Sequence, residues 1–119
     1  MRVDAGSFKG RRLLENKFEH IRPTTDKVRQ ALFTKLQFFL PNSRVLDLFC
    51  GTGALGIEAL SRGASEVVFV DKDSRSAKMT RDNLKALGLN AKVIRCDALA
   101  YLDSFKEKFY LILLDPQYK

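Results

Sequence analysis

The sequence has little that would support a metal site or a membrane span. It contains only two cysteines and one histidine, and neither cysteine has a second thiol or imidazole at metal-ligand spacing. We therefore expect no metal, and we expect Cys50 and Cys96 to be reduced core thiols. No stretch approaches the roughly 20 apolar residues of a transmembrane helix, and residues 1–10 lack the apolar run of a signal peptide. These absences predict a cytoplasmic protein without membrane contact.

Repeats, low-complexity tracts and flexible linkers are also missing, and the 119 residues with 45% apolar content fit one small domain with a hydrophobic core. The charge is unevenly distributed. Residues 1–44 carry ten Lys or Arg against four Asp or Glu, whereas residues 45–119 carry eleven against ten. Such an N-terminal excess is either a solvated surface or the electrostatic footprint of a protein that binds a polyanion such as RNA.

The N-terminal part has its own pattern. The stretch MRVDAGSFKGRRLLE alternates short apolar and polar residues around two glycines, which predicts a hairpin or an extended arm. We divide the chain into this basic arm, residues 1–22, and a second region, residues 23–119. The candidate RNA contacts in the arm are its four cationic residues, Arg2, Lys9, Arg11 and Arg12.

Residues 21–41 predict an amphipathic helix. Thr24 or Thr25 would cap its start and Pro41 would stop it. The apolar positions at helical spacing are Val28, Leu32, Leu36 and Phe39/Leu40. We expect four phenylalanines, Phe33, Phe38, Phe39 and Phe69, to lie in the core rather than to stack on bases.

From residue 44 the chain alternates strand and helix patterns. The expected strands are residues 44–49, 66–71, 91–96 and 109–115, and the expected helices are 54–63, 74–88 (capped by Ser74) and 98–105. Continuous Val, Ile, Leu and Phe runs alternating with helices predict an α/β fold, a parallel sheet with helices on both faces. Asn83 is expected on the polar surface of its helix. Ligands in such folds bind at the carboxyl ends of the strands, where each strand ends at or beside an acid: Asp47, Asp71, Asp97 and Asp115.

A glycine-rich loop follows the first strand. Gly51, Gly53 and Gly56 match G-x-G-x-x-G, and Asp71 follows Gly51 by twenty residues, so a dinucleotide site is admissible. Asp47 at the end of the same strand would repel a pyrophosphate. It is compatible with the ammonium group of S-adenosylmethionine, which has no phosphate. The pattern therefore favours this cofactor, while a nicotinamide oxidoreductase stays open on the glycines alone.

The next two acids suit the rest of that cofactor. Asp71 is placed to accept hydrogen bonds from the ribose hydroxyls. Asp97 could accept from the adenine amine, with the Ala98 N–H as a companion donor. Alternatively, Asp97 caps the short helix that begins at Ala98, and the two roles are compatible.

The last residues, Asp115-Pro116-Gln117-Tyr118, resemble the (Asp/Asn)-Pro-Pro-(Tyr/Phe) motif of methyltransferases that modify exocyclic amines of bases. Hydrogen bonds from the amine to the Asp115 carboxylate and the Pro116 carbonyl would aim its nitrogen at the methyl group. Tyr118 would offer a face on which the base stacks. In the alternative interpretation, Asp-Pro closes a strand and Tyr118 is a surface aromatic.

Six segments in order give the chain a resemblance to the bacterial 16S ribosomal RNA (guanine-N2) methyltransferase family: GSFKGRRL, RPTTDKVRQALF, LDLFCGTGALGIEALSRGA, VFVDKD, CDAL and DPQY. The resemblance implies a Rossmann-like domain that binds S-adenosylmethionine and acts on 16S ribosomal RNA or the small ribosomal subunit through an RNA-binding N-terminal arm. It also implies that the Arg22-to-Thr25 segment lies near the cofactor's amino acid end. The cofactor residues it implies are Arg22, Thr24, Thr25, Asp47, Phe49, Gly51, Gly53, Asp71, Lys72, Asp97 and Ala98.

The chain departs from that family in two ways. Gln117 replaces a second proline, which loosens the turn but keeps both proposed acceptors. The family also has further strands, in the order 3-2-1-4-5-7-6, so we expect a C-terminally truncated chain whose residues 109–114 form an apolar edge that pairs with another chain or is otherwise covered. The open alternatives are a non-catalytic fragment that binds cofactor or RNA, and a DNA adenine-N6 methyltransferase, against which RPTTDKVRQALF argues.

Overall fold

A computed structural model describes residues 2–14, 26–104, 106 and 108–115. Its helices are α1 (Asp26–Leu36), α2 (Ala54–Ser61), α3 (Ser74–Ala86) and α4 (Ala98–Ser104). Its strands are β1 (Arg44–Asp47), β2 (Glu66–Asp71), β3 (Lys92–Arg95) and β4 (Leu111–Leu113). No helix in these described ranges is long and apolar enough to cross a bilayer.

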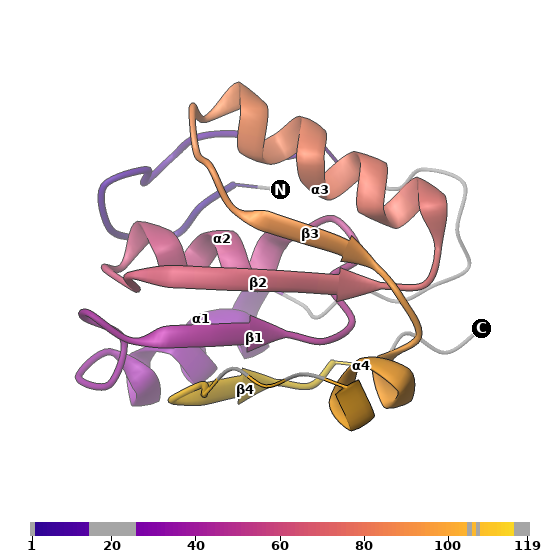
Figure 1. The fold of residues 1–119 in the computed structure, drawn as a ribbon. Coiled ribbons are helices and arrows are strands. Elements are labelled where there is room, and N and C mark those ends of the chain that lie inside the picture. Colours follow the sequence, from indigo (N-terminus) through magenta and orange to yellow (C-terminus); the bar gives the residue numbers. More distant parts are fainter. Residues whose placement is uncertain (1, 15–25, 105, 107, 116–119) are drawn as a thin grey trace.

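The four strands form one parallel sheet in the order β3-β2-β1-β4 (Figure 1). The register pairs Asp47 of β1 with Phe69 of β2 on one side and with Leu113 of β4 on the other. This confirms the α/β fold and the predicted 3-2-1-4 order. All carboxyl ends therefore lie at the same edge, where a ligand site is expected.

The sheet has a hydrophobic cluster on each face because its buried strands alternate their side chains between the faces. On one face Val45, Val67 and Phe69 pack against the helices α2 and α3 and against the N-terminal segment. On the other face Leu46, Val68 and Val70 pack against α4. Helices thus cover both faces, as the apolar runs predict.

The N-terminal segment is a hairpin, as the alternating pattern predicts. Arg2 and Arg12 face each other in an antiparallel bridge, and the Val3 N–H donates to the Arg11 carbonyl (2.9 Å). Val3 and Leu13 are buried in the same cluster as the sheet. The hairpin is therefore integrated into the core and is not a detached arm.

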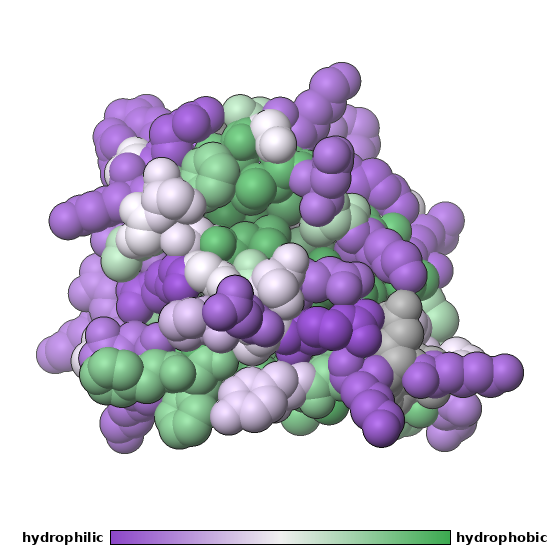
Figure 2. All heavy atoms as spheres, turned by 60° about the vertical axis from the view of Figure 1, so that its left-hand side comes forward, coloured by the Kyte–Doolittle hydropathy of each residue, from purple (hydrophilic) through white to green (hydrophobic). Residues whose placement is uncertain are grey.

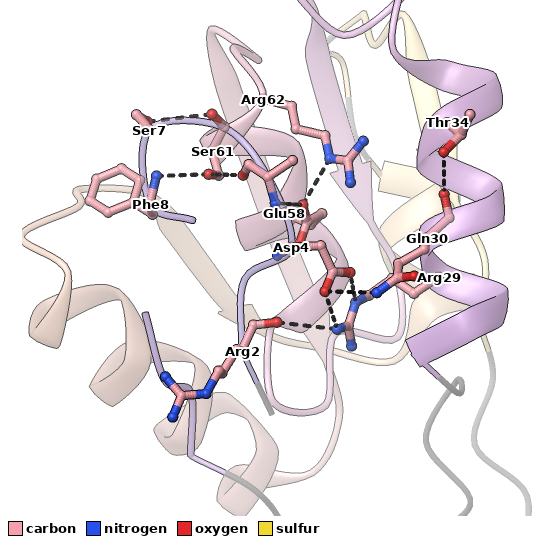
Figure 3. Close-up of polar contacts among 11 residues, drawn as sticks. Arg2, Asp4, Ser7, Phe8, Arg29, Gln30, Thr34, Glu58, Ser61 and Arg62 are labelled. Carbon is pink, nitrogen blue, oxygen red and sulfur yellow. Dashed lines mark hydrogen bonds and ion pairs between the residues drawn. The ribbon is translucent and has the colours of Figure 1, made fainter. Parts of the chain in front are cut away.

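A polar network fastens the hairpin to α1 and α2 (Figure 3). The Glu58 carboxylate, 1% exposed, accepts from the Asp4 and Ala5 N–H groups (2.9 and 3.1 Å) and from Arg62 (2.8 Å). The Asp4 carboxylate in turn accepts from Arg29, 2% exposed, at 3.1 Å. The two buried charges are paired, which is the condition for tolerating them in a core.

The buried face of α1 differs from the predicted stripe. Val28 is 57% exposed, whereas Arg29, Phe33 and, beyond the helix, Leu40 are buried. Leu40 belongs to the predicted stripe and Leu36 packs against the core, so the stripe departs from the prediction mainly at its start. There the Asp4 carboxylate of the hairpin pairs with Arg29, which is buried in place of Val28. No amphipathic pattern signals such a pairing.

The expectation that all four phenylalanines are core residues is half wrong. Phe33 and Phe69 are fully buried, but Phe38 is 85% exposed and Phe39 51% exposed. The helix ends at Leu36, before Pro41 could stop it. Phe38 and Phe39 then lie on a surface turn, where the Phe39 ring centroid is 6.4 Å from that of Tyr110.

Two smaller expectations on capping and thiols are also corrected. Asp73, not Ser74, caps α3, because its side chain accepts from the Arg75 N–H at 2.9 Å. Both cysteines are free, but only Cys50 is buried, while Cys96 is half-buried beside the end of β3.

Candidate functional site

Four carboxylates lie at the carboxyl edge of the sheet. Asp47 and Asp71 are the last residues of β1 and β2, while Asp97 and Asp115 each follow their strand by two residues. The order β3-β2-β1-β4 makes these strand ends neighbours. This arrangement is the one that the strand pattern predicts.

Asp47 is completely buried, and its two oxygens differ. Oδ2 accepts from the Gly56 N–H at 3.1 Å, in the first turn of α2. This bond replaces a side-chain cap, which α2 lacks, and the positive helix terminus favours a carboxylate there. Oδ1 is buried and has no hydrogen-bond partner among the described residues. Asp47 therefore keeps an acceptor that is still unsatisfied.

Burial raises the pKa of Asp47 to about 7, with further upward contributions from the charges of Asp115 and Asp71; the Gly56 N–H opposes the shift. The order β2-β1-β4 places these three acids at the ends of adjacent strands. Such a cluster is unfavourable for an anion and favourable for a cation. The negative charge of this cluster therefore favours a ligand with a positively charged group over a ligand with a pyrophosphate.

Asp71 fastens the glycine loop to β2. One of its oxygens accepts from the Gly51 N–H (3.0 Å) and the other accepts from the Asp73 N–H (2.9 Å). The carboxylate is half-buried, and each oxygen has a second lone pair for a ligand hydroxyl. Asp71 can therefore shape the loop and contact a ligand at the same time.

The three glycines of the loop serve different purposes. Gly51 has φ 54°, and a Cβ there would meet nothing within 4 Å, so its backbone faces open space. At Gly53 a Cβ would lie 2.9 Å from Thr80 Cγ2, and at Gly56 it would lie 2.3 Å from a Phe69 ring carbon. Gly53 and Gly56 thus allow tight packing, while Gly51 leaves room for a ligand to approach the backbone.

Two polar residues of α3 that sequence reasoning missed hold the loop from behind. The buried Thr80 hydroxyl donates to the Gly51 carbonyl (2.8 Å) and lies 3.3 Å from the Cys50 sulfur. Asn83 was expected on the surface but is only 2% exposed. Its amide donates to the Thr52 carbonyl (2.8 Å) and accepts from the Leu14 N–H (2.7 Å).

Asn83 therefore ties the end of the hairpin to the glycine loop. The available signal was its spacing, because Thr80 and Asn83 share a helix face with the apolar Ala77 and Leu84. Burial, with the neighbouring Asp47 charge, raises the pKa of the Cys50 thiol, which disfavours the thiolate form.

Asp97 caps α4, accepting from the Leu99 and Ala100 N–H groups (3.1 and 3.2 Å). The structure thus shows the helix-capping role that was one of the two interpretations of Asp97. Its exposed carboxylate can still accept further hydrogen bonds. Ala98, the first residue of α4, is buried. Lys72 is exposed directly after β2, and the half-buried Phe49 packs beside the second hydrophobic cluster.

Some predicted site residues are not placed. Arg22, Thr24, Thr25, Pro116 and Tyr118, as well as Gln117, lie outside the described residues. The predicted RNA contacts Arg2, Lys9, Arg11 and Arg12 are all exposed on the hairpin. The hairpin turn lies at the opposite end of the molecule from the strand arrowheads (Figure 1). Among the described residues no cluster of His, Cys, Asp and Glu could hold a metal ion.

Comparison with known proteins agrees with the fold and the motifs. The family model "Conserved hypothetical protein 95" matches residues 1–119. The Bacillus subtilis protein "Putative rRNA methyltransferase YlbH" is 44% identical over 100% of this chain and 67% of its own length. Ribosomal RNA small subunit methyltransferase D of Escherichia coli K12 is 33% identical over 100% of this chain and 61% of its own length.

A solved structure is also similar to this chain. "Putative methyltransferase yhhF from Escherichia coli" superposes with a TM-score of 0.89 at 34% identity, over 98% of this chain and 64% of that one. The chain thus spans about two thirds of the length of these relatives. It belongs to the Conserved hypothetical protein 95 family, and its relatives include a small-subunit ribosomal RNA methyltransferase.

Proposed function

We propose that this chain contributes the cofactor half and the catalytic motif of a cytoplasmic methyltransferase that moves a methyl group from S-adenosylmethionine to the exocyclic N2 of a guanine in 16S ribosomal RNA. One observation carries the proposal. Three carboxylates, Asp47, Asp71 and Asp115, lie at the ends of adjacent strands beside a glycine loop whose Gly51 faces open space. The names of the relatives support ribosomal RNA as the substrate.

The residues fit a cationic cofactor with ribose hydroxyls. The unsatisfied Oδ1 of Asp47 provides the acceptor for an ammonium group, directly or through water. Asp71 has spare lone pairs for the ribose, and Asp97 with the Ala98 N–H stands beyond β3 for the adenine. Two solved neighbours with S-adenosylhomocysteine-type ligands in their titles, at 22% and 28% identity, have the same fold. When bound, the cofactor would supply an electrophilic methyl group.

We assign the catalytic role to Asp115, together with Pro116 and Tyr118, which follow it in the sequence. The lone pair of a guanine amine is delocalised into the ring, so the nitrogen is a weak nucleophile until it is oriented. The Asp115 carboxylate would accept a hydrogen bond from this amine and hold the nitrogen in line with the methyl donor. Transfer of the methyl group from the bound cofactor would leave S-adenosylhomocysteine, and the amine would give up one proton to water. Asp115 stabilises the positive charge on nitrogen until that proton leaves.

The test is transfer of a radiolabelled methyl group to unmodified 16S ribosomal RNA or small subunits by the full-length gene product. Asp115→Asn should lower the rate at least about 100-fold, because it removes the charge that stabilises the transition state. The matched control is Asp103→Asn, an exposed acid in the last turn of α4, which should keep the wild-type rate. Equal rates for the two variants would overturn the mechanism.

The identity of the methylated nucleoside tests whether guanine N2 is the target. Digestion of the product RNA should yield N2-methylguanosine. Methyl incorporation into adenines of DNA instead would favour a DNA adenine-N6 methyltransferase. Cofactor binding without any transfer would show a non-catalytic module.

A further inference from the structure

A basic surface extends beyond the four hairpin cations that the sequence singles out. Arg2 and Arg12 stand opposite each other in the hairpin bridge and are both exposed. Like charges facing each other across two strands are destabilising. Arg2 is held in this position by a hydrogen bond from Nη1 to the Gly10 carbonyl (3.0 Å), so the hairpin presents two neighbouring positive charges to solvent.

The hairpin surface continues onto α3. Arg11 Nη2 donates to the Ala86 carbonyl at 3.1 Å, which brings the hairpin against the end of that helix. Arg81 and Lys85 lie one turn apart on α3 and are both exposed. In the described part of the chain neither has a carboxylate partner, whereas Lys78 of the same helix pairs with Asp82 at 2.8 Å.

Helix electrostatics account for only part of this arrangement. Lys85 in the last turn complements the negative helix terminus. Arg81 is one turn earlier, where that effect has faded, and two like charges at i and i+4 repel. Arg81 instead donates to the Val93 carbonyl of β3 (3.1 Å), which fixes its side chain against the strand.

Arg81 and Lys85 border a hollow of about 270 Å³ between the end of α3 and the start of β3. Its other lining residues are apolar or neutral, among them Leu84, Leu89, Asn90 and Val93, and no acid lines it. Figure 2 brings forward the side of the molecule that carries the hairpin, and it shows hydrophilic side chains around a hydrophobic hollow. Cations around an acid-free hollow complement a polyanion.

We infer that the RNA-binding surface runs from the hairpin across the end of α3 to this hollow, where Arg81 and Lys85 hold the sugar–phosphate backbone of RNA flanking the target guanine. The inference rests on the proposed function, since it takes RNA as the substrate. Contacts to phosphates supply affinity and orientation but do not read the base sequence. The hairpin and α3 therefore set the position of the RNA, and the acidic edge of the sheet performs the chemistry.

The experiment measures binding of unmodified 16S ribosomal RNA to the full-length gene product over a series of salt concentrations. Each lost phosphate contact makes the plot of log affinity against log salt concentration shallower by about one. Arg81→Gln with Lys85→Gln should therefore reduce the slope by about one to two and weaken binding. Lys85→Arg, which keeps the charge, should retain the slope.

The control is Lys108→Gln, an equal change of charge next to β4 at the other edge of the sheet. It should leave the slope unchanged, and calorimetric binding of S-adenosylmethionine should be equal in all variants. If the double variant keeps the slope of Lys108→Gln while the wild type methylates RNA, the surface is refuted and the function stands. If the wild type binds RNA with the expected slopes but transfers no methyl group, the surface stands and the function fails. A wild type that binds no RNA would overturn both.

Discussion

The two ends of the sheet differ in charge and in how the charged groups are held. At the carboxyl ends of the strands, Asp47 and Asp71 are held by backbone N–H groups of the glycine loop and of the chain after β2. At the hairpin, the cations project into solvent from a framework fastened by Glu58. The acidic end is preorganised for one small cation, while the basic end offers spread charge to a long polyanion.

The largest expected effect is a loss of stability at the hairpin end of the molecule. Glu58→Ala leaves the Asp4 and Ala5 N–H groups and Arg62 without their shared acceptor in a buried site. We expect the free energy of unfolding to fall by about 3 kcal/mol, as for other broken buried pairs. Urea denaturation measures it. Cofactor binding should change less than RNA binding, and Glu58→Gln, which keeps one acceptor oxygen, should lose less stability.

Asn83 tests whether the two ends are coupled. Asn83→Ala leaves the Leu14 N–H and the Thr52 carbonyl unpaired, at a cost of about 2 kcal/mol in unfolding free energy. Because Thr52 belongs to the glycine loop, affinity for S-adenosylmethionine should fall as well, which calorimetry can measure. Asn90→Ala, at an exposed position after α3, is the matched control. If Asn83→Ala lowers stability but leaves cofactor affinity intact, the two ends are independent.

The smallest expected effect is a pH dependence of stability and cofactor affinity that arises from Asp47 at the acidic edge of the sheet. The pKa of Asp47 is raised from 3.8 to about 7, so the folded chain holds a proton that the unfolded chain has lost. The contribution of this group to the free energy of unfolding therefore falls as pH rises from about 4 to about 7, and then levels off. A cofactor ammonium group would favour the ionised form, so the affinity for the cofactor should rise about fivefold from pH 6 to pH 7.

Asp47→Asn keeps an acceptor for the Gly56 N–H but does not titrate. Its stability and its cofactor affinity should both lose the component that depends on pH in this range. The comparison between wild type and variant removes the contribution of all other acids. A wild-type affinity that is flat from pH 6 to pH 8 would mean that Asp47 does not meet the ammonium group.

Much of the fold could be predicted because it follows from local patterns. The continuous apolar runs before Asp47 and Asp71 mark buried parallel strands, and the glycines after Asp47 mark the loop. Since parallel strands end at one edge, the acids at their ends had to meet there. The roles of these acids toward the cofactor remain predictions, as do the roles of Asp115 and the hairpin cations.

Contacts between distant segments could not be predicted in the same way. Nothing near Arg29 in the sequence indicates that it will be buried against Asp4. The spacing of Asn83 places it on the apolar face of its helix, but nothing there indicates that Leu14 and Thr52 will be its partners. A polar side chain becomes buried only when a distant backbone or carboxylate satisfies its hydrogen bonds.

The sequence by itself determined the alternation of strands and helices, the place of the glycine loop and the acids at the strand ends, because periodicity and turn chemistry are local properties. The order of the strands was implied by the family resemblance. The tertiary structure alone decided which face of α1 is buried, that Asp47 caps α2 with one oxygen, and that Asn83 joins the hairpin to the loop. These depend on partners 25 to 69 residues away, or on the angle at which the loop returns. Their free energy arises only after the chain has packed.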